Sequence, residues 1–436
     1  MTDSQASLTL LAGGDVAPLL QPVDQFAELI QPTLDTVDFR FLQCERTYSH
    51  RGSWPDWQTI PAGHWTRLDP EYASVFKAAR ADVVSVASNH ALDFGWEALE
   101  DTIELFTSWG MQVVGGGANQ AEAHKPVICE KDGVRVAILA YCSVIRDGQA
   151  AVGDHPGVAG LRARSWYVPI VFQPGCQPQI MSEAIEPDMV AMENDIRAAK
   201  KIAHAVVVCL HWGVRYIPKV LATYQQPVAH RAIDAGADVI IGHHPHTLKP
   251  VEVYKGKVCF YSIGNFLTTG QQDASKTSHA EWNLFWYERT PGARYGFPDH
   301  CRQIVLPKLT ITTEGISRVG MIPAYINDQA QPAAVRPGDP RFDEVLNRLE
   351  WVSAESEHRF EVVGDELEVV TLSPTGRPGR PAAGGLRWRG HERRTHRRRT
   401  GGRGRRGRFR GRAQRSGSGR IPDRRGRALL ARRPTR

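Results

Sequence analysis

The sequence of 436 residues contains no run of 18 or more apolar residues, the length that a membrane-spanning helix requires. Its first residues, Met1-Thr2-Asp3-Ser4-Gln5, lack the basic segment and the apolar segment of a secretory signal. We therefore expect no membrane partner. The chain is long enough for one large domain or two ordinary ones, with a buried core.

Cysteine is scarce, and its seven residues are scattered without a CxxC pair. An odd, unclustered set argues against a disulfide framework and against a cysteine zinc site. Reduced thiols are the simpler interpretation, and they favour a cytoplasmic protein. The seven positions are Cys44, Cys129, Cys142, Cys176, Cys209, Cys259 and Cys301.

Lysine is absent from residues 373–436, which hold 23 arginines and two acids, a net charge of +21. Residues 1–372 hold 31 basic and 45 acidic residues, a net charge of −14. The net charge of +7 for the whole chain is therefore the sum of an acidic body and a basic tail. The tail is rich in Arg, Gly and Pro and is predicted to be disordered. Its abrupt composition and its lack of lysine also suit a GC-rich gene translated in a shifted frame, which is the interpretation we favour, so we assign the tail no function.

The acidic body argues against nucleic acid as the main substrate, because the body would repel phosphates. Only the arginine-rich tail could bind nucleic acid, and only non-specifically. A small anionic substrate stays compatible with the body, since bound metal ions would dominate the local field.

Short apolar runs alternate with helical patterns along the chain, which predicts an α/β fold. Residues 1–330 are predicted to form the main domain, with an irregular, Gly- and Pro-rich insertion at about 145–182 over the active face. Residues 331–372 form a C-terminal extension with a helix at 341–353. The other predicted helices are 23–36, 71–81, 96–109, 189–203 and 222–235, and the main predicted strands are 8–12, 37–42, 82–87, 134–141, 205–210 and 239–241.

Metal-capable side chains follow five of these apolar runs. Each alone has an ordinary explanation, such as a turn aspartate, a surface glutamate or a buried core histidine. Ligands bind at the carboxyl ends of strands in open α/β sheets, so five such groups together predict a site there. Mixed oxygen and nitrogen ligands suit two divalent cations such as Mn, Fe or Zn. The groups are Asp15, Glu45, Asn89 with His90, His211, and His244 with His246.

Two stretches carry most of this chemistry. In Gly242-His243-His244-Pro245-His246, a tight turn fixed by Pro245 can aim two imidazoles into one space. In Asn89-His90, the amide oxygen can ligate a metal while the imidazole serves as a general acid. Asp93 can either orient His90 or cap the following helix, and we favour the cap.

Together these motifs resemble the calcineurin-like metallophosphoesterases, and in finer detail the capsule-synthesis CapA family of poly-γ-glutamate biosynthesis. The resemblance covers about residues 8–325 and implies a four-layer α/β/β/α sandwich. The motifs are Gly14-Asp15-Val16, Asn89-His90-Ala91-Leu92-Asp93-Phe94-Gly95, His211-Trp212-Gly213, Gly242-His243-His244-Pro245-His246 and Tyr261-Ser262-Ile263-Gly264-Asn265-Phe266.

The resemblance also implies roles for individual residues. Glu45 would bridge two metals, and His90, with Asp93, would be catalytic. Apart from the resemblance, Arg215, Asn265 and Arg146 are candidates for substrate contact, although arginines on loops are ordinarily solvated. One metal would be held by Asp15, Glu45 and His246, and the other by Glu45, Asn89, His211 and His244.

Several positions depart from the family pattern. Ala17 replaces a histidine that general phosphoesterases place two residues after the first aspartate, which puts the filling of one metal site in doubt. Gln43 and Ser88 each replace an asparagine, and Arg215 follows His211-Trp212-Gly213 where the family commonly has a glutamate.

Two functions fit this sequence. The first is a metal-dependent hydrolase that attacks a phosphoester or a γ-glutamyl-type amide with metal-bound hydroxide. The second is a non-catalytic, metallophosphoesterase-like assembly subunit in polymer or natural-product biosynthesis, which the loss of the histidine at position 17 favours. We prefer the enzyme because His90 and the His244–His246 pair are kept. The sequence does not determine the metal, the substrate or the oligomeric state.

Overall fold

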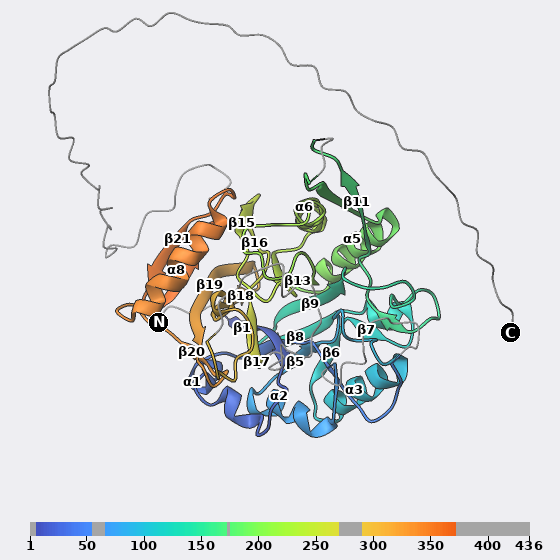
Figure 1. The fold of residues 1–436 in the computed structure, drawn as a ribbon, viewed down its shortest axis with the longest axis horizontal. Coiled ribbons are helices and arrows are strands. Elements are labelled where there is room, and N and C mark those ends of the chain that lie inside the picture. Colours follow the sequence, from blue (N-terminus) through green and yellow to red (C-terminus); the bar gives the residue numbers. More distant parts are fainter. Residues whose placement is uncertain (1–5, 55–65, 172–174, 270–289, 372–436) are drawn as a thin grey trace, which may run out of the picture. The chain divides into compact units, whose positions relative to one another are not determined.

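The computed structural model describes residues 6–54, 66–171, 175–269 and 290–371. Most of their strands belong to two sheets (Figure 1), so the predicted α/β fold is confirmed. The arginine-rich segment 373–436, predicted to be disordered, lies outside the described residues.

The larger sheet has ten strands and is parallel at its centre, where β1 pairs with β2, β2 with β5 and β5 with β6. Antiparallel strands β18, β19, β22 and β21 extend it on the other side of β1, while β17 pairs with β1 and β20 with β19. The strands are β1 Ser7–Ala17, β2 Phe39–Cys44, β5 Val83–Ser85, β6 Gln112–Val114, β17 Asn265–Thr268, β18 Gln303–Thr312, β19 Gly315–Ile326, β20 Pro332–Ala334, β21 Phe360–Val363 and β22 Glu366–Val369.

The second sheet has six strands, of which β9, β13, β14 and β16 run parallel and β8 and β15 form antiparallel edges. Its strands are β8 Val127–Lys131, β9 Val134–Cys142, β13 Ala205–His211, β14 Val239–His243, β15 Val251–Tyr254 and β16 Lys257–Phe260. Three two-stranded pairs complete the list: β3 Thr47–Tyr48 with β4 Arg67–Leu68, β7 Gly116–Gly117 with β10 Gly157–Val158, and β11 Ala163–Val168 with β12 Gln179–Ala184.

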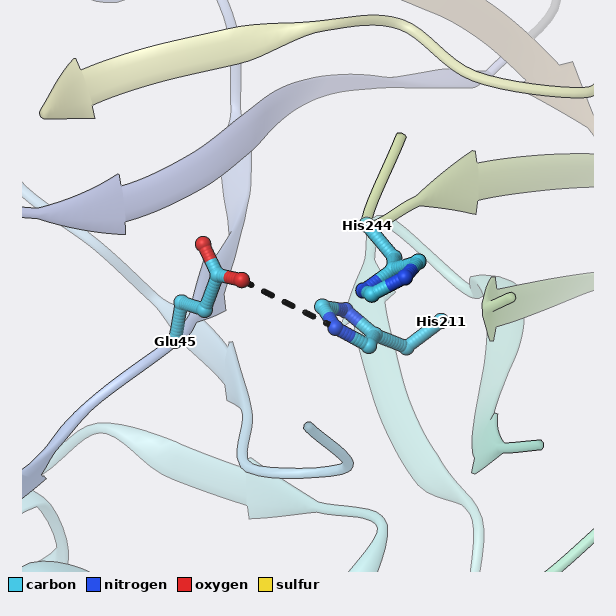
Figure 2. A group of neighbouring side chains, drawn as sticks. All are labelled: Glu45, His211 and His244. Atoms are coloured by element: carbon cyan, nitrogen blue, oxygen red, sulfur yellow. Dashed lines mark ion pairs between the residues drawn. The ribbon is translucent and has the colours of Figure 1, made fainter. Parts of the chain in front are cut away.

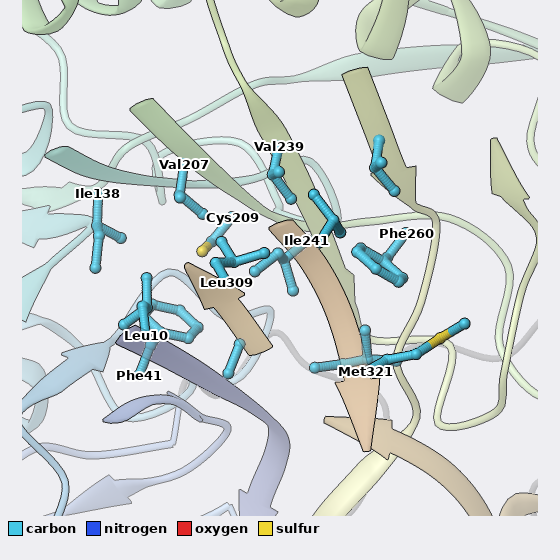
Figure 3. Packing of buried hydrophobic residues seen from close by; sticks show 14 of the residues in the cluster. Leu10, Phe41, Ile138, Val207, Cys209, Val239, Ile241, Phe260, Leu309 and Met321 are labelled. Atoms are coloured by element: carbon cyan, nitrogen blue, oxygen red, sulfur yellow. The ribbon is translucent and has the colours of Figure 1, made fainter. Parts of the chain in front are cut away.

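Both faces of the central strands are buried, which explains why their sequences are continuously apolar rather than alternating. Successive side chains on a strand point to opposite faces. On β13, Val207 and Cys209 therefore enter the cluster between the sheets, while Val206, Val208 and Leu210 enter a different cluster on the outer face. Figure 3 shows the inner cluster.

Three buried clusters define four layers. The inner cluster joins residues of both sheets, such as Leu10 and Leu309 with Ile241. A second packs β1 and β2 against η1, α1 and α2, and a third packs β13 and β14 against α5 and α6. This is the helix–sheet–sheet–helix order that the family resemblance predicts. The helices are η1 Asp24–Ala27, α1 Gln31–Leu34, η2 Pro70–Ala73, α2 Ser74–Ala78, α3 Trp96–Ser108, α4 Gln120–Ala123, α5 Glu186–Lys200, α6 Gln225–Ala235, η3 Asp299–Cys301 and α8 Pro340–Ser353.

Two predicted segments differ from the structure. The helix predicted over 23–36 is divided into η1 and α1, because Pro32 has no N–H to donate and is tolerated only in the first turn of a helix. The insertion 145–182, predicted to be irregular, contains the antiparallel hairpin of β11 and β12. Its beginning reaches the predicted site, where the Arg146 guanidinium contacts Asp93.

The C-terminal extension continues the large sheet, since β22 pairs with β19 and β21 with β22. Its helix α8 packs Phe342, Val345 and Leu349 into the inner cluster. Within the described ranges, no helix combines the length and the apolar character needed to span a membrane.

Gly14 provides a test of how closely the strands approach one another. A Cβ on Gly14 would lie 2.0 Å from the carbonyl oxygen of Gly264. We expect Gly14→Ala to lower the free energy of unfolding by about 3 kcal/mol or more, because rigid backbone would have to move. The control is Gly133→Ala, which has open space but a φ of +78° and should cost about 1 kcal/mol. Chemical denaturation measures both, and equal losses would contradict the expectation.

Candidate metal centre

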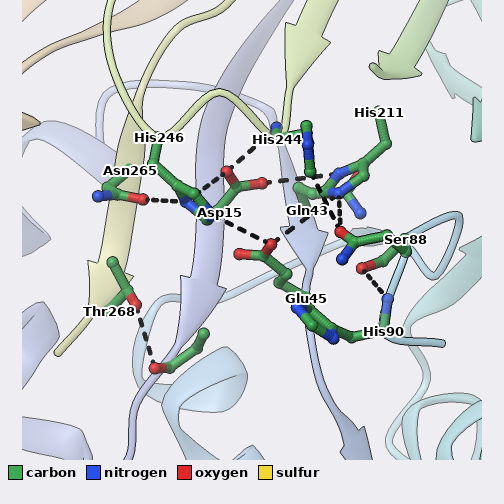
Figure 4. A network of polar contacts seen from close by, with 12 residues as sticks. Asp15, Gln43, Glu45, Ser88, His90, His211, His244, His246, Asn265 and Thr268 are labelled. Carbon is green, nitrogen blue, oxygen red and sulfur yellow. Dashed lines mark hydrogen bonds and ion pairs between the residues drawn. The ribbon is translucent and has the colours of Figure 1, made fainter. Parts of the chain in front are cut away.

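The six predicted metal ligands meet where parallel strands of both sheets end, and Figure 4 labels all of them except Asn89. Asp15 lies near the end of β1, Glu45 directly follows β2, and Asn89 follows β5 in the large sheet. From the second sheet, His211 is the last residue of β13, and His244 directly follows β14. The two sheets therefore supply different ligands: carboxylate and amide oxygens from one, imidazoles from the other.

One cluster consists of Glu45, His211 and His244, whose potential ligand atoms all lie within 4.8 Å of one another (Figure 2). Glu45 Oε1 is 3.9 Å from His211 Nε2. Asn89 joins the cluster through its amide oxygen, which is 2.7 Å from His211 Nε2 and 3.2 Å from His244 Nδ1. These are the four residues expected to hold one metal.

A second cluster consists of Asp15, Glu45 and His246, again within 4.8 Å. His246 Nδ1 is 3.3 Å from Asp15 Oδ2, and His246 Nε2 is 3.4 Å from Glu45 Oε1. Glu45 belongs to both clusters, which is the position that a bridging carboxylate requires.

The hydrogen bonding of these groups tests whether metals fit the site. Buried polar atoms normally have a partner. Among the described residues, four atoms here have no hydrogen-bond partner although they are buried: Asp15 Oδ1, both carboxylate oxygens of Glu45, and His211 Nδ1. Two divalent cations would neutralise the two carboxylates and bind the lone pairs that now converge without donors. The residues therefore fit a dinuclear centre.

Burial also sets the charge of the ligands. Burial away from water raises the pKa of Asp15 to about 7, and a hydrogen bond from the His244 N–H lowers it by a smaller amount. It likewise raises the pKa of Glu45 to about 7. Burial lowers the pKa of His211 and of His244 well below the usual value, with a further lowering by neighbouring histidines. The imidazoles are thus neutral and able to ligate at neutral pH.

The turn that carries the histidine pair is backbone-strained. His244 has a φ of 89° and His246 a φ of 58°, a left-handed conformation that is uncommon for residues other than glycine. The His244 N–H donates to Asp15 Oδ2 at 3.2 Å, which ties this turn to β1. The sharp turn predicted at Pro245 therefore places both imidazoles on the side of the carboxylates.

A chain of hydrogen bonds behind His246 defines its tautomer. The Tyr295 hydroxyl donates to the Cys301 carbonyl at 2.8 Å, so it accepts from Asn265 Nδ2 at 2.7 Å. Asn265 Oδ1 must then accept from His246 Nδ1 at 2.9 Å, which leaves the lone pair of His246 on Nε2, facing Glu45. Asn265 has no exposed surface. Its contacts make it an orienting residue for His246, and its contact with a substrate stays a prediction.

His90 and Asp93 form a pair beside the ligands. Asp93 Oδ2 is 2.7 Å from His90 Nδ1, and Asp93 Oδ1 contacts the Arg146 guanidinium. Burial would raise the pKa of Asp93, but the bond to His90 and the charge of Arg146 lower it. The favoured capping role is wrong: Gly95 precedes α3, and no side chain of the described residues caps that helix. The geometry matches the alternative interpretation, in which Asp93 orients His90.

Several neighbours of the site were not singled out from the sequence. The Tyr216 ring stacks on His246 with 5.5 Å between centroids and an interplanar angle of 18°, and Phe297 lies 4.9 Å from the same imidazole. Arg46 is buried beside Glu45, and its charge lowers the pKa of Glu45 after the larger effects of burial and His246. The position of Arg46 directly after the predicted ligand Glu45 is the feature of the sequence that could have indicated its place in the site.

The predicted substrate contact Arg215 lies close enough to act on the site by its charge. After the larger effects of burial and neighbouring histidines, its guanidinium lowers the pKa of His211 and of His244. Ala17 ends β1 opposite Thr268, whose hydroxyl donates to the Ala17 carbonyl at 3.1 Å. The side chain of Ala17 is a methyl group, which cannot ligate a metal as the histidine of general phosphoesterases would at this position.

These features define an α/β protein with a candidate dinuclear metal centre at the carboxyl ends of strands from two facing sheets. Residues 9–269 match the family model described as bacterial capsule synthesis protein PGA_cap. The chain belongs to this family, as its motifs predicted.

Curated relatives carry related names. A PGA biosynthesis protein CapA from Bacillus subtilis is 36% identical over 202 residues, covering 46% of each chain. A capsule biosynthesis protein CapA from Bacillus anthracis is 33% identical over 197 residues, covering 45% of this chain and 42% of the relative. A probable polyglutamine synthesis accessory protein from Mycobacterium tuberculosis is 29% identical over 203 residues, covering 46% and 48%. The chain thus spans about half the length of the curated relatives it matches.

Solved structures show weaker likeness. A hypothetical protein from Thermus thermophilus aligns over 72% of this chain and 98% of its own, with a TM-score of 0.40 and 13% identity. The calcineurin-like phosphoesterase YfkN from Bacillus subtilis aligns over 80% and 99%, with a TM-score of 0.33 and 14% identity.

Metal affinity is expected to depend on pH. Asp15 and Glu45 have pKa values of about 7, so below pH 7 a cation must displace their protons, and above it these carboxylates are already ionised. Affinity for Mn²⁺ should rise between pH 6 and pH 7, by up to about tenfold per pH unit for each proton displaced, and level off by about pH 8. Calorimetry in two buffers of different ionisation enthalpy counts the released protons. A constant affinity from pH 6 to pH 8 would contradict this.

The hydroxyl of Tyr295 is expected to support metal binding from behind His246. Tyr295→Phe removes the acceptor of Asn265 Nδ2, so the amide can turn over and the His246 tautomer is no longer specified. We expect about a tenfold loss of Mn²⁺ affinity at one of the two sites, measured by calorimetry. Tyr325→Phe, at a half-buried tyrosine in β19, is the matched control. Equal affinities in the two variants would show that the relay has no effect.

Proposed function

We propose that this chain is a hydrolase that depends on two divalent metal ions and acts on a phosphoester or a γ-glutamyl-type amide bond in poly-γ-glutamate or capsule biosynthesis. The observation that carries the proposal is Glu45. It belongs to both candidate ligand clusters, and both of its oxygens are buried without a hydrogen-bond partner among the described residues.

Two bound divalent ions would supply Lewis acidity, which lowers the pKa of water and stabilises negative charge developing on oxygen. Phosphoryl and acyl centres both develop such charge, so the ligand set serves either bond. The names of the relatives, which refer to PGA, capsule and polyglutamine synthesis, favour the γ-glutamyl amide. A small anionic or γ-glutamyl substrate is the partner we propose.

His90 is the residue proposed to move the proton. Its Nδ1 is held by Asp93 at 2.7 Å, so a proton passed to a leaving group has to depart from Nε2. Burial lowers the pKa of His90 to about 4, despite the opposing bond to Asp93. The resting imidazole is therefore neutral, and an anionic substrate beside it would favour the imidazolium form. Under this proposal, His90 gains its proton together with the substrate.

The second candidate is a non-catalytic assembly subunit. Ala17 supports it, because one metal cluster then has three ligands, Asp15, Glu45 and His246. A subunit of this kind would still need the buried carboxylates to be neutralised, but it would not need the His90–Asp93 pair. Variants at His90 and at Glu45 therefore separate the two candidates.

We expect His90→Asn to keep both metals and to lose about 10²- to 10⁴-fold in hydrolysis rate. Glu45→Ala should lose metal from both clusters. Metal content is measured by inductively coupled plasma mass spectrometry after purification without chelators. Hydrolysis rates are measured on a panel of phosphoesters and γ-glutamyl amides. The control is His155→Asn, at an exposed histidine.

Two results would contradict the hydrolase. Parent protein that binds no Mn, Fe or Zn would remove its basis. Parent protein that binds two ions but cleaves no member of the panel, with His90→Asn indistinguishable from it, would favour the assembly subunit.

A further inference from the structure

A fully buried lysine lies three residues after the ligand His246. Lys249 has no exposed surface. Its ammonium group donates to the carbonyl oxygen of Val220 at 2.6 Å and also contacts the carbonyl oxygen of Ile217. Burial lowers the pKa of Lys249 to about 7. An amine is rarely buried without an acidic partner, so these two carbonyl bonds call for an explanation.

Both carbonyls belong to residues 213–224, which lie in the connection from β13 to α6 and which we name the Arg215 loop. The loop is attached to the metal-binding turn at Tyr216. The Tyr216 N–H donates to the Pro245 carbonyl at 2.9 Å, and its ring stacks on His246. Its carbonyl oxygen is 2.9 Å from His300 Nε2.

Tyr216 also adopts a left-handed backbone conformation, with a φ of 62°. Such a residue persists only where its surroundings hold it in place. The bonds of Pro245 and His300 hold Tyr216 itself, and those of Lys249 hold the next part of the loop. An apolar side chain could fill the volume of Lys249, but it could not donate to two loop carbonyls.

We propose that Lys249 is a positioning residue that fixes the Arg215 loop, so that Arg215 stays beside the metal centre and binds the anionic group of the substrate. The inference rests on the proposed function for the nature of that substrate. The attachment of the loop itself does not depend on hydrolysis.

The test uses the full chain loaded with Mn²⁺ and compares Lys249→Met with Lys219→Met. Lys219 is on the same loop, but its ammonium group is 3.4 Å from Glu355 and lies over the Trp351 ring. Hydrogen–deuterium exchange of the amides of residues 216, 217 and 219–221 should be at least about tenfold faster in Lys249→Met, because the exchange follows local opening. Amides of β9 should be unchanged, and Lys219→Met should match the parent throughout.

A second readout uses inorganic phosphate as the anion, which requires no catalysis. Its Kd should rise about tenfold in Lys249→Met, the range expected for losing a hydrogen bond to a charged group. In an Arg215→Ala background the same change should add nothing, because coupled residues are not additive. If a substrate is cleaved, KM should rise while kcat changes less than about twofold.

Unchanged loop exchange or unchanged phosphate affinity in Lys249→Met would overturn the proposal, as would additive effects with Arg215→Ala. If the methionine variant does not fold, Lys249→Gln keeps a donor and should give a smaller effect in the same direction. A parent that binds phosphate but cleaves nothing would contradict the hydrolase, while the loop result would stand.

Discussion

Burial of two carboxylates with too few hydrogen-bond donors is the constraint on which the rest of this structure depends. Asp15 and Glu45 have almost no exposed surface, and three of their four oxygens have no hydrogen-bond partner in the described part of the chain. Burying an unpaired charge opposes folding strongly, so such groups either take up protons or are neutralised. The raised pKa values of Asp15 and Glu45 reflect their tendency to take up protons. A pair of bound cations would neutralise them instead.

The two sheets make this arrangement possible. Parallel strands of each sheet end at the same edge, and glycines let the chain segments approach closely at that edge. A Cβ on Gly242 would lie 2.1 Å from the Tyr261 carbonyl oxygen, and one on Gly14 would meet Gly264 similarly. Because one sheet brings oxygen ligands and the other brings imidazoles, neither sheet alone forms a site.

Residues behind the ligands give the site its orientation. Tyr295 acts on His246 through Asn265, Arg146 acts on His90 through Asp93, and Lys249 holds a loop that contacts His246. In each case a buried polar group is satisfied by a partner far away in the sequence. Such outer contacts define tautomers and ring directions, which the ligands by themselves leave open.

The sequence by itself determined the α/β class, most strands and the six candidate metal ligands, because apolar runs and the groups that follow them are local features. The prediction of one continuous helix over 23–36 was wrong for a reason that is also local, because Pro32 is tolerated only in the first turn of a helix. Only the tertiary structure decided that Asp93 holds His90 instead of capping α3, that Asn265 lies behind His246, and that Lys249 reaches the Arg215 loop. Each of these roles depends on distances between segments that meet only after folding, and no local periodicity or spacing encodes those distances.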